Sequence, residues 1–329
     1  MPANLTHQFR RAQARYRAAT ELREQLDALQ EMLREIPKHK GTEHLQADIK
    51  RKIKVAKETA RSTKRSHSGP SYKIDSGGYP QVVVIGPPNA GKSSLIHALT
   101  GTDLFVAPYP YSTREPHPAM MPFERARIQL VDTPPIAANH MEPWIADLVR
   151  AADALLVVMD LGAGDLLEGC EGVVNQLARH KLFLGVVPES HAQSIGALAK
   201  RFFVAANKWD DQDASASLEI FSELYADRFE ILPVSVTTEF RIEVLRRAIW
   251  DMLDVVRAVP KPPGKPPDED DPILLPRGST VLDMARSIHG ELADHLKRAR
   301  VWHCKDHAEG QWVSRAHVIE DGEIFELET

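Results

Sequence analysis

Five short apolar runs, each bounded by turn residues, dominate the middle of the chain. They are "QVVVI" (81–85), "RIQLV" (127–131), "ALLVVM" (154–159), "FFVAA" (202–206) and "FEILPV" (229–234). Runs of this length are typical of strands that are buried on both faces, and helical segments lie between several of them. The pattern therefore predicts an α/β fold, with a doubly wound, mostly parallel sheet and helices on both of its faces.

Ahead of this region, apolar residues recur with the period of a helix. The first stripe contains Leu22, Leu26, Leu29, Leu33 and Ile36, and the second contains Leu45, Ile49, Ile53, Ala56 and Ala60. Steps of four and three place each set on one side of a helix. With Pro37 ending the first, we expect two amphipathic helices that fold back as a hairpin, followed by a linker of Gly, Ser and Pro near residues 66–79.

The end of the chain predicts a further small unit. The proline-rich stretch "VPKPPGKPPDEDDP" is expected to be a stiff, extended spacer. After it come a strand "ILL", one helix from about Val281 and short strands ending in "EIFELE", which suggests a small sheet with one helix across it. The expected apolar face of that helix contains Leu282, Ala285, Ile288, Leu292 and Leu296. The predicted parts are residues 1–78, 79–258, 259–272 and 273–329.

Charge changes the picture of the helical hairpin. The whole chain has a formal net charge of -5, but residues 1–67 hold 16 Lys and Arg against 8 Asp and Glu. This asymmetry favours contact with RNA or another polyanion, the alternative being a solvated helix face. The absence of an apolar signal segment or membrane-length run predicts a cytoplasmic protein. Neither of the two cysteines, Cys170 and Cys304, has a metal-ligand partner at short spacing, so a zinc site or disulfide framework is not expected.

The sequence "GPPNAGKS" (86–93) fits the phosphate-loop pattern G-x-x-x-x-G-K-[S/T]. It stands between a predicted strand and the helix "SSLIHALT", which is the context that such a loop requires. The glycines let the backbone wrap phosphates, Lys92 reaches the β and γ phosphates, and Ser93 places a hydroxyl on Mg²⁺. The nucleotide-contacting candidates of this loop are Gly86, Asn89, Ala90, Gly91, Lys92, Ser93 and Ser94.

A second motif, "NKWD" (207–210), directly follows a predicted strand. Asp210 can accept hydrogen bonds from N1-H and the exocyclic amine of guanine, a donor pair that adenine does not offer. Asn207 can bond the opposite edge, and Lys208 completes the motif. In "PVSV" (233–236), Ser235 and Val236 are expected to support the base. Together with a phosphate loop, these residues predict a guanine nucleotide site.

Between these motifs lie candidate ligands for a metal ion. In "YPYSTREP", Thr113 is the candidate switch residue whose hydroxyl joins Mg²⁺ when a γ-phosphate is present, with Ser112 as an alternative. Asp132 closes a predicted strand and is the expected Walker B carboxylate. The metal candidates are therefore Ser93, Thr113 and Asp132, and the catalytic candidates are Lys92 and Thr113.

The ordered motifs resemble those of translation-factor-type GTPases, and "GPPNAGKSSLIHALTGT" with "YPYST" resembles the Obg-like GTPases more closely. "EIPKHKGTEHLQADIKRKIKVAKE" is similar to the basic hairpin of the developmentally regulated GTP-binding protein (DRG) branch, and "LPRGSTVLDMARSIHGELADHLKRARVW" to its TGS domain. The resemblance implies a P-loop G domain at 79–258 and a β-grasp TGS domain at 273–329. It also implies GTP, GDP and Mg²⁺ as ligands, and ribosomes, RNA or translation-associated proteins as partners.

The chain departs from this family at switch II. The family reads Asp-x-Pro-Gly, and its glycine N-H bonds the γ-phosphate, but here that position is Pro135. Losing a donor to a charged oxygen costs about 1.5 to 3 kcal/mol, so GTP should be distinguished less sharply from GDP. Ile136 stands where related enzymes carry a glutamine. The domain that family members insert within the G domain is also expected to be missing.

Asn89 suggests how hydrolysis could proceed without that glutamine. An Asn at this position resembles potassium-dependent GTPases, in which it helps to hold K⁺ beside the phosphates, although a simple turn residue is an equal alternative. The sequence thus predicts a slow GTPase that acts as a ribosome- or RNA-associated switch. The alternatives are a GTP-binding scaffold without hydrolysis or switching, and an RNA-binding protein whose nucleotide only supports folding.

Overall fold

The structure, a computed structural model, describes residue 15 and residues 22–36, 72, 74–102, 115–191 and 195–329. The chain forms two compact units, residues 1–71 and residues 72–329. Among the helices described, none has the length and apolar character needed to cross a membrane.

The first unit contains α2 (Leu22–Glu35). The described buried side chains are Ala28, Leu29, Met32 and Ile36. The predicted apolar stripe is therefore confirmed at Leu29 and Ile36. At the intervening turn of the helix, Met32 is buried, whereas the predicted Leu33 is only half-buried. The second predicted helix, with Leu45 to Ala60, lies outside the described residues.

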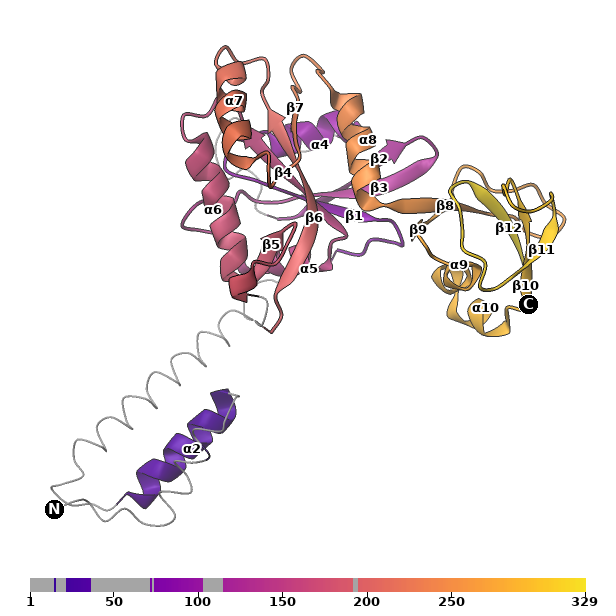
Figure 1. Cartoon of the computed structure of the whole chain (residues 1–329), viewed down its shortest axis with the longest axis horizontal. Helices are drawn as coiled ribbons and strands as arrows, with labels where there is room; N and C mark the ends of the chain where they lie inside the picture. The colour runs from indigo at the N-terminus through magenta and orange to yellow at the C-terminus, as the bar shows by residue number, and fades with distance from the viewer. Residues whose placement is uncertain (1–14, 16–21, 37–71, 73, 103–114, 192–194) are drawn as a thin grey trace. The chain divides into compact units, whose positions relative to one another are not determined.

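The larger unit is built on a seven-stranded sheet (Figure 1). Its strands are β1 (Gln81–Ile85), β2 (His117–Phe123), β3 (Ala126–Asp132), β4 (Ala154–Asp160), β5 (Leu182–Leu184), β6 (Leu198–Asn207) and β7 (Ile231–Pro233). The order is β2-β3-β1-β4-β6-β5, and β7 pairs with β6. Every pairing is parallel except that of β2 with β3. This confirms the predicted mostly parallel α/β sheet.

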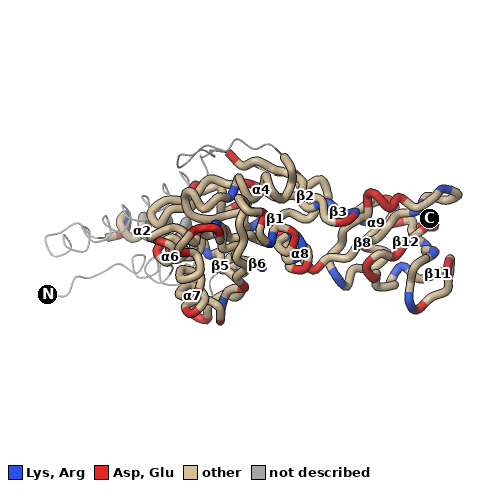
Figure 2. The backbone as a smooth tube through the Cα atoms, turned by 90° about the horizontal axis from the view of Figure 1, so that it is seen from above, with Lys and Arg blue, Asp and Glu red and all other residues tan. Residues whose placement is uncertain are grey.

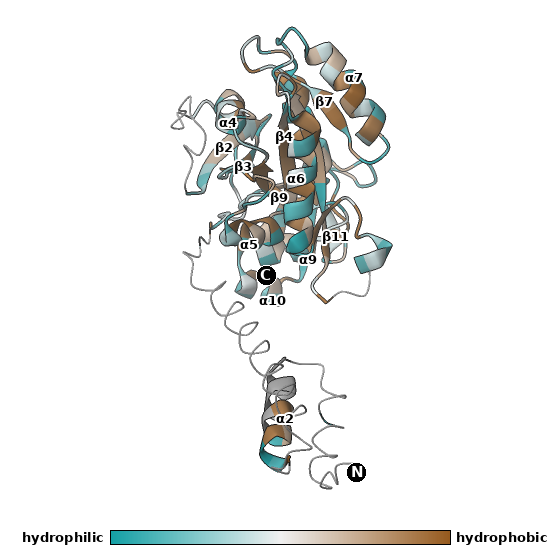
Figure 3. Cartoon of the chain, turned by 90° about the vertical axis from the view of Figure 1, so that its left-hand side faces the viewer, coloured by the Kyte–Doolittle hydropathy of each residue, from teal (hydrophilic) through white to brown (hydrophobic). Residues whose placement is uncertain are grey.

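Helices cover both faces of the sheet. Successive side chains of each strand point to opposite faces, so each face has its own apolar core. Val83 and Ile85 pack into a core with α5 (Pro143–Ala151), α6 (Leu166–Arg179) and α7 (Ala214–Tyr225). Val82 and Val84 pack into a second core with α4 (Lys92–Thr100) and α8 (Ile242–Leu253). Figure 3 shows the hydrophobic colour concentrated on the central strands. Burial on both faces explains why these strands are continuous apolar runs.

Two strands of this sheet were not expected. β2 contains Pro118 and Pro122, which lack a backbone donor and so weaken the sequence pattern of a strand. It is an edge strand that pairs only with β3 among the described strands, a place where proline is tolerated. β5 is only 3 residues long, too short to give a recognisable alternation.

The C-terminal part of the larger unit is a small domain, a five-stranded sheet with two helices. Its elements are β8 (Val255–Pro260), β9 (Ile273–Pro276), α9 (Val281–Ile288), α10 (Gly290–His295), β10 (Arg298–Trp302), β11 (Gln311–Ser314) and β12 (Glu323–Glu328). The order is β11-β10-β12-β8-β9, with β8 parallel to β12 and the other pairs antiparallel. Figure 2 shows acidic and basic residues interspersed along it.

Two expectations for this region are wrong. The central domain was expected to reach residue 258 and the spacer to begin at 259, but β8 hydrogen-bonds with β9 and β12. The small sheet therefore begins at Val255. The single predicted helix is broken at His289, whose backbone is extended (φ -164°) and whose side chain caps the following helix by accepting from the Glu291 N-H at 3.3 Å.

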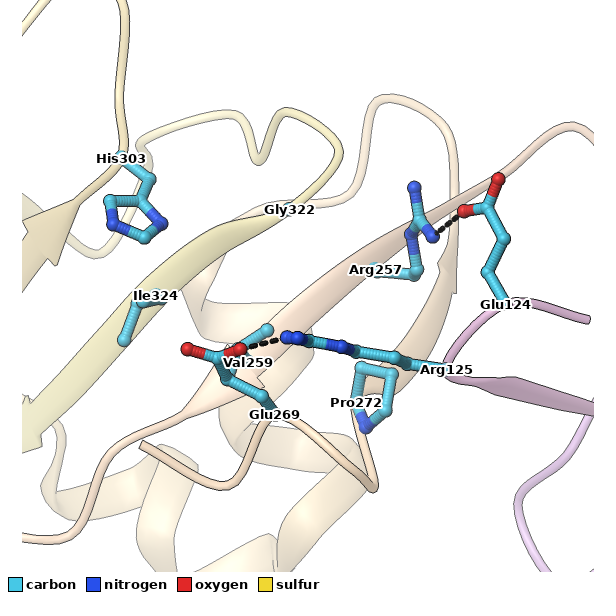
Figure 4. Close-up of a pocket in the computed structure, with 9 residues that line it drawn as sticks. All are labelled: Glu124, Arg125, Arg257, Val259, Glu269, Pro272, His303, Gly322 and Ile324. Atoms are coloured by element: carbon cyan, nitrogen blue, oxygen red, sulfur yellow. Dashed lines mark hydrogen bonds and ion pairs between the residues drawn. The ribbon is translucent and has the colours of Figure 1, made fainter. Parts of the chain in front are cut away.

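Ion pairs connect the two sheets of the larger unit (Figure 4). Arg257 of β8 donates to Glu124, in the turn between β2 and β3, and to Asp321 at 2.7 Å. Arg125 of the same turn pairs with Glu269. Beside these pairs is a cavity of about 320 Å³, whose lining includes Glu124, Arg125, Arg257, Glu269, Val259 and Ile324. The turn that follows β2 is thereby fixed to the small sheet.

Candidate functional site

The loop between β1 and α4 requires glycine at two positions. Gly86 has φ +155°, and a Cβ there would lie 2.3 Å from the Val158 carbonyl oxygen. Gly91 has φ +87°, and its Cβ would lie 2.4 Å from Nδ2 of Asn207. Asn89 is exposed and adopts φ +59°, a left-handed conformation that asparagine tolerates. The loop therefore has the tight wrapped form that the sequence predicts.

Lys92, the first residue of α4, folds its side chain back over this loop. Its Nζ donates to the carbonyl oxygens of Gly86 at 3.2 Å and Pro87 at 3.0 Å. The residue is only 7% exposed. Burial lowers the pKa of Lys92 to about 8, and the nearby Asp132 carboxylate partly opposes this shift. The ammonium group is thus held inside the loop, where an anionic ligand would compensate its lost hydration.

Ser93 and Asp132 meet beside the phosphate loop. The Ser93 hydroxyl donates to Oδ2 of Asp132 at 2.5 Å. Asp132 is 1% exposed and ends β3, and the parallel register sets it beside Val84 of β1. A hydroxyl and a carboxylate are the hard oxygen ligands that Mg²⁺ prefers. Of the three predicted metal ligands, these two lie together, while Thr113 and its alternative Ser112 lie outside the described residues.

The segment after Asp132 is buried against the phosphate loop. The Thr133 hydroxyl donates to the Val84 carbonyl at 2.7 Å. The Ile136 N-H donates to the Gly86 carbonyl at 3.0 Å, and its side chain belongs to the core under α5 and α6. Pro134 and Pro135 are buried between these two anchors. Pro135 stands next to the loop that would hold phosphate, and it has no N-H to offer.

A short turn follows and is fixed to α6. Ala137 and His140 exchange backbone hydrogen bonds of 2.9 and 3.2 Å. The buried Gln176 donates to the Ala138 carbonyl at 2.7 Å. A Cβ on Gly172 would lie 3.0 Å from Cα of Ala138, a tighter contact than most Cβ atoms make, so glycine favours this close approach. Sequence reasoning did not identify Gly172 or Gln176, because their partner is 34 or more positions away in the chain.

The "NKWD" segment lies on the other side of the same loop. Asn207 ends β6, and its Nδ2 donates to the Ala90 carbonyl at 3.0 Å. Its buried Oδ1 has no hydrogen-bond partner among the residues described. Lys208 adopts φ +63° and forms an ion pair of 2.6 Å with Asp160 at the end of β4. Asp160 was missed in the sequence, although it closes a predicted strand in the same way as Asp132.

Asp210 projects into a cavity of about 580 Å³. The buried Ser235 donates its hydroxyl hydrogen bond to Asp210, which is the main cause of the lowered pKa of that carboxyl. Asp210 is therefore an ionised acceptor at neutral pH. The cavity is lined by Gly91, Ser94, Asn207, Lys208, Asp210, Asp211, Gln212, Asp213, Val236 and Thr237. The phosphate loop and the two predicted base-contacting segments thus share one cavity.

Two family models match the chain. Residues 81–195 match a family described as 50S ribosome-binding GTPase, and residues 256–329 match the TGS domain. The second match begins at the strand that the sequence prediction assigned to the preceding domain. A GTP-binding protein from Pyrococcus horikoshii has a similar solved structure, at 16% identity and a TM-score of 0.48, over 76% of this chain and 99% of that one.

Relatives match most of the chain at low identity. Ribosome-interacting GTPase 1 of Saccharomyces cerevisiae is 24% identical, covering 92% of this chain and 98% of the relative. A DRG 2 homolog of Dictyostelium discoideum is 25% identical, covering 88% of this chain and 94% of the relative. An uncharacterized GTP-binding protein of Methanocaldococcus jannaschii is 24% identical, covering 93% of this chain and 92% of the relative. Its alignment spans 361 positions against the 329 residues here, so the relative carries residues without a counterpart in this chain.

Proposed function

We propose that this chain, which carries a GTPase domain and a C-terminal TGS domain and is similar to developmentally regulated GTP-binding proteins, hydrolyses GTP slowly and acts as a ribosome- or RNA-associated switch. The observation that carries the proposal is the bond from Asn207 to the Ala90 carbonyl. It joins the guanine-reading segment to the phosphate loop around one cavity. A nucleoside with phosphates would contact both segments at once.

The residues present fit a magnesium ion. Ser93 and Asp132 would hold it, the hydroxyl directly and the carboxylate through water, with Thr113 as the predicted third ligand. Their 2.5 Å contact brings two oxygen ligands together at the start of α4. When bound, Mg²⁺ neutralises charge on the β and γ phosphates. Lys92 would add a second positive charge there, and the start of α4 would add backbone donors.

Pro135 supports the low rate in this proposal. It is buried beside the phosphate loop without a donor, and the neighbouring Ile136 N-H is already used by the Gly86 carbonyl. The γ-phosphate would therefore find one fewer backbone donor, worth about 1.5 to 3 kcal/mol. Ile136 also has its side chain in the core, so it cannot orient an attacking water.

Asn89 is proposed to hold a potassium ion that assists hydrolysis in place of the groups missing at Pro135 and Ile136. The left-handed backbone and the exposure of Asn89 agree equally with a plain turn residue. A substitution must therefore distinguish a potassium ligand from a turn residue. We expect single-turnover hydrolysis to be at least tenfold faster in K⁺ than in Na⁺, because a cation at the phosphates stabilises the charge of the transition state. Asn89→Gly keeps the backbone conformation and removes the side-chain oxygen, and it should abolish the difference between the two salts.

A second candidate function is a GTP-binding scaffold that neither hydrolyses nor switches. The contacts of Gln176 and Gly172 with Ala138 favour it, since they fix the turn after Pro135 against α6. The same single-turnover experiment decides. A rate equal to that of free GTP in both K⁺ and Na⁺ would remove the enzyme proposal and leave the scaffold.

The proposed RNA or ribosome contact rests on the N-terminal charge. Sixteen Lys and Arg stand against eight Asp and Glu in residues 1–67, and the yeast relative is named as ribosome-interacting. Contacts to phosphate release counterions, so RNA affinity should fall by about 10³-fold or more between low and moderate salt. Filter binding with a structured RNA measures this. Deleting residues 1–67 should remove the salt-dependent binding, and an unchanged affinity after the deletion would contradict the assignment.

A further inference from the structure

Three metal-ligating side chains meet in the small domain, away from the nucleotide motifs in sequence. Cys304 follows β10, His317 lies in the loop between β11 and β12, and Glu323 begins β12. One ligand atom of each, sulfur, nitrogen and oxygen, lies within 4.8 Å of the other two. From its spacing in the sequence, Cys304 was not expected to take part in a metal site, but the antiparallel pairing of β10 with β12 brings Glu323 close to it.

Glu323 is the feature that points to a cation. It is 1% exposed, and its Oε2 accepts hydrogen bonds from the Glu320 N-H at 3.0 Å and from Nε2 of His317 at 3.2 Å. Its buried Oε1 has no hydrogen-bond partner in the described part of the chain. A buried carboxylate oxygen without a partner is costly, and buried charges are normally paired or coordinate metals.

The surroundings leave a route for an ion. Cys304 is partly exposed, and the His317 side chain is 14% exposed. The ring of His307 lies 5.3 Å from that of His317, centre to centre, and would supply a second nitrogen as a fourth ligand.

We propose that Cys304, His317 and Glu323 form a binding site for a thiophilic divalent cation, for which Zn²⁺ fits best, with His307 or water in the fourth position. Zn²⁺ takes tetrahedral sets of sulfur, nitrogen and oxygen ligands. Ligation needs only side-chain rotations that bring atoms now within 4.8 Å of one another to metal-ligand range. Binding releases the thiol proton and joins the loop after β10 to the loop between β11 and β12 and to the first residue of β12.

Cobalt titration of the untagged, metal-stripped full chain tests this site. We expect one equivalent of Co²⁺ to produce a thiolate-to-cobalt charge-transfer band in the near ultraviolet, and Zn²⁺ to displace it. Oxygen ligands such as Ser93 and Asp132 cannot produce this band, so the nucleotide site does not interfere. The near-isosteric Cys304→Ser should lose the band, while Cys170→Ser, at the other cysteine, should keep it.

A second measurement guards against variants that fold poorly. Zn²⁺ should raise the Tm of the wild-type chain and of Cys170→Ser, but not that of Cys304→Ser. Competition with a chromophoric chelator should show at least tenfold weaker binding in Glu323→Gln and His317→Asn. A cobalt spectrum without a thiolate band, or a band that Cys304→Ser retains, would overturn the proposal.

Discussion

Replacing Asp210 by asparagine is expected to lower the affinity for GDP by about ten- to a hundredfold, the value of a charge-assisted hydrogen bond. Asp210 faces the shared cavity as an ionised acceptor, held by the Ser235 hydroxyl. A carboxylate accepts both donors of guanine, whereas an amide offers one acceptor and one donor. The amide matches xanthine, which carries an oxygen in place of the guanine amine, so affinity for xanthosine diphosphate should rise.

Fluorescence competition with both diphosphates measures this exchange. Asp227→Asn removes an exposed carboxylate outside the lining of that cavity and should leave both affinities unchanged. If Asp210→Asn binds GDP as tightly as the wild type, the guanine-reading role of residues 207–210 is wrong.

The second large effect is a pH dependence that Lys92 imposes on stability. Its pKa is about 8 in the folded chain against 10.5 as the ordinary value, because the ammonium group is buried. Between these values the unfolded chain binds more protons than the folded one, so stability rises with pH. One unit is worth 1.36 kcal/mol, so we expect a gain of about 3 kcal/mol across this window without nucleotide.

Urea unfolding between about pH 8 and about pH 10.5 tests the expectation. Lys92→Met should lack this rise and should also bind GDP at least tenfold more weakly, because a charged donor to phosphate is lost. Lys265→Met, in an exposed turn, controls for the general loss of one positive charge. Equal pH profiles for the wild type and Lys92→Met would show that the lysine is not buried as described.

The central sheet and the arrangement of the candidate nucleotide-site residues could be predicted from sequence because their constraints are local. Strands buried on both faces must be apolar throughout, which makes β1 and β4 recognisable. Gly86 and Gly91 need conformations and close approaches that other residues resist. Asp132 and Asn207 end parallel strands, and the sheet then brings them to the same edge.

The features that were missed depend on contacts between distant residues. Residues 255–258 of β8 were assigned to the central domain and its last two residues to the spacer, and only the pairing of β8 with β9 and β12 places it in the small sheet. Gly172 is favoured by the close approach of the Ala138 backbone, which no local pattern reveals. Cys304 appeared isolated because its neighbours His317 and Glu323 come from the next loop and strand.

The central claim is that Pro135 weakens the distinction between GTP and GDP, and calorimetry with GDP and a non-hydrolysable GTP analogue tests it most directly. We predict that the wild-type chain binds the two within about tenfold of each other, since one charged hydrogen bond is missing. Pro135→Ala restores the N-H and should raise the preference for the GTP analogue by ten- to a hundredfold on the same physical grounds. A wild-type preference already above a hundredfold, with no change in Pro135→Ala, would contradict the account.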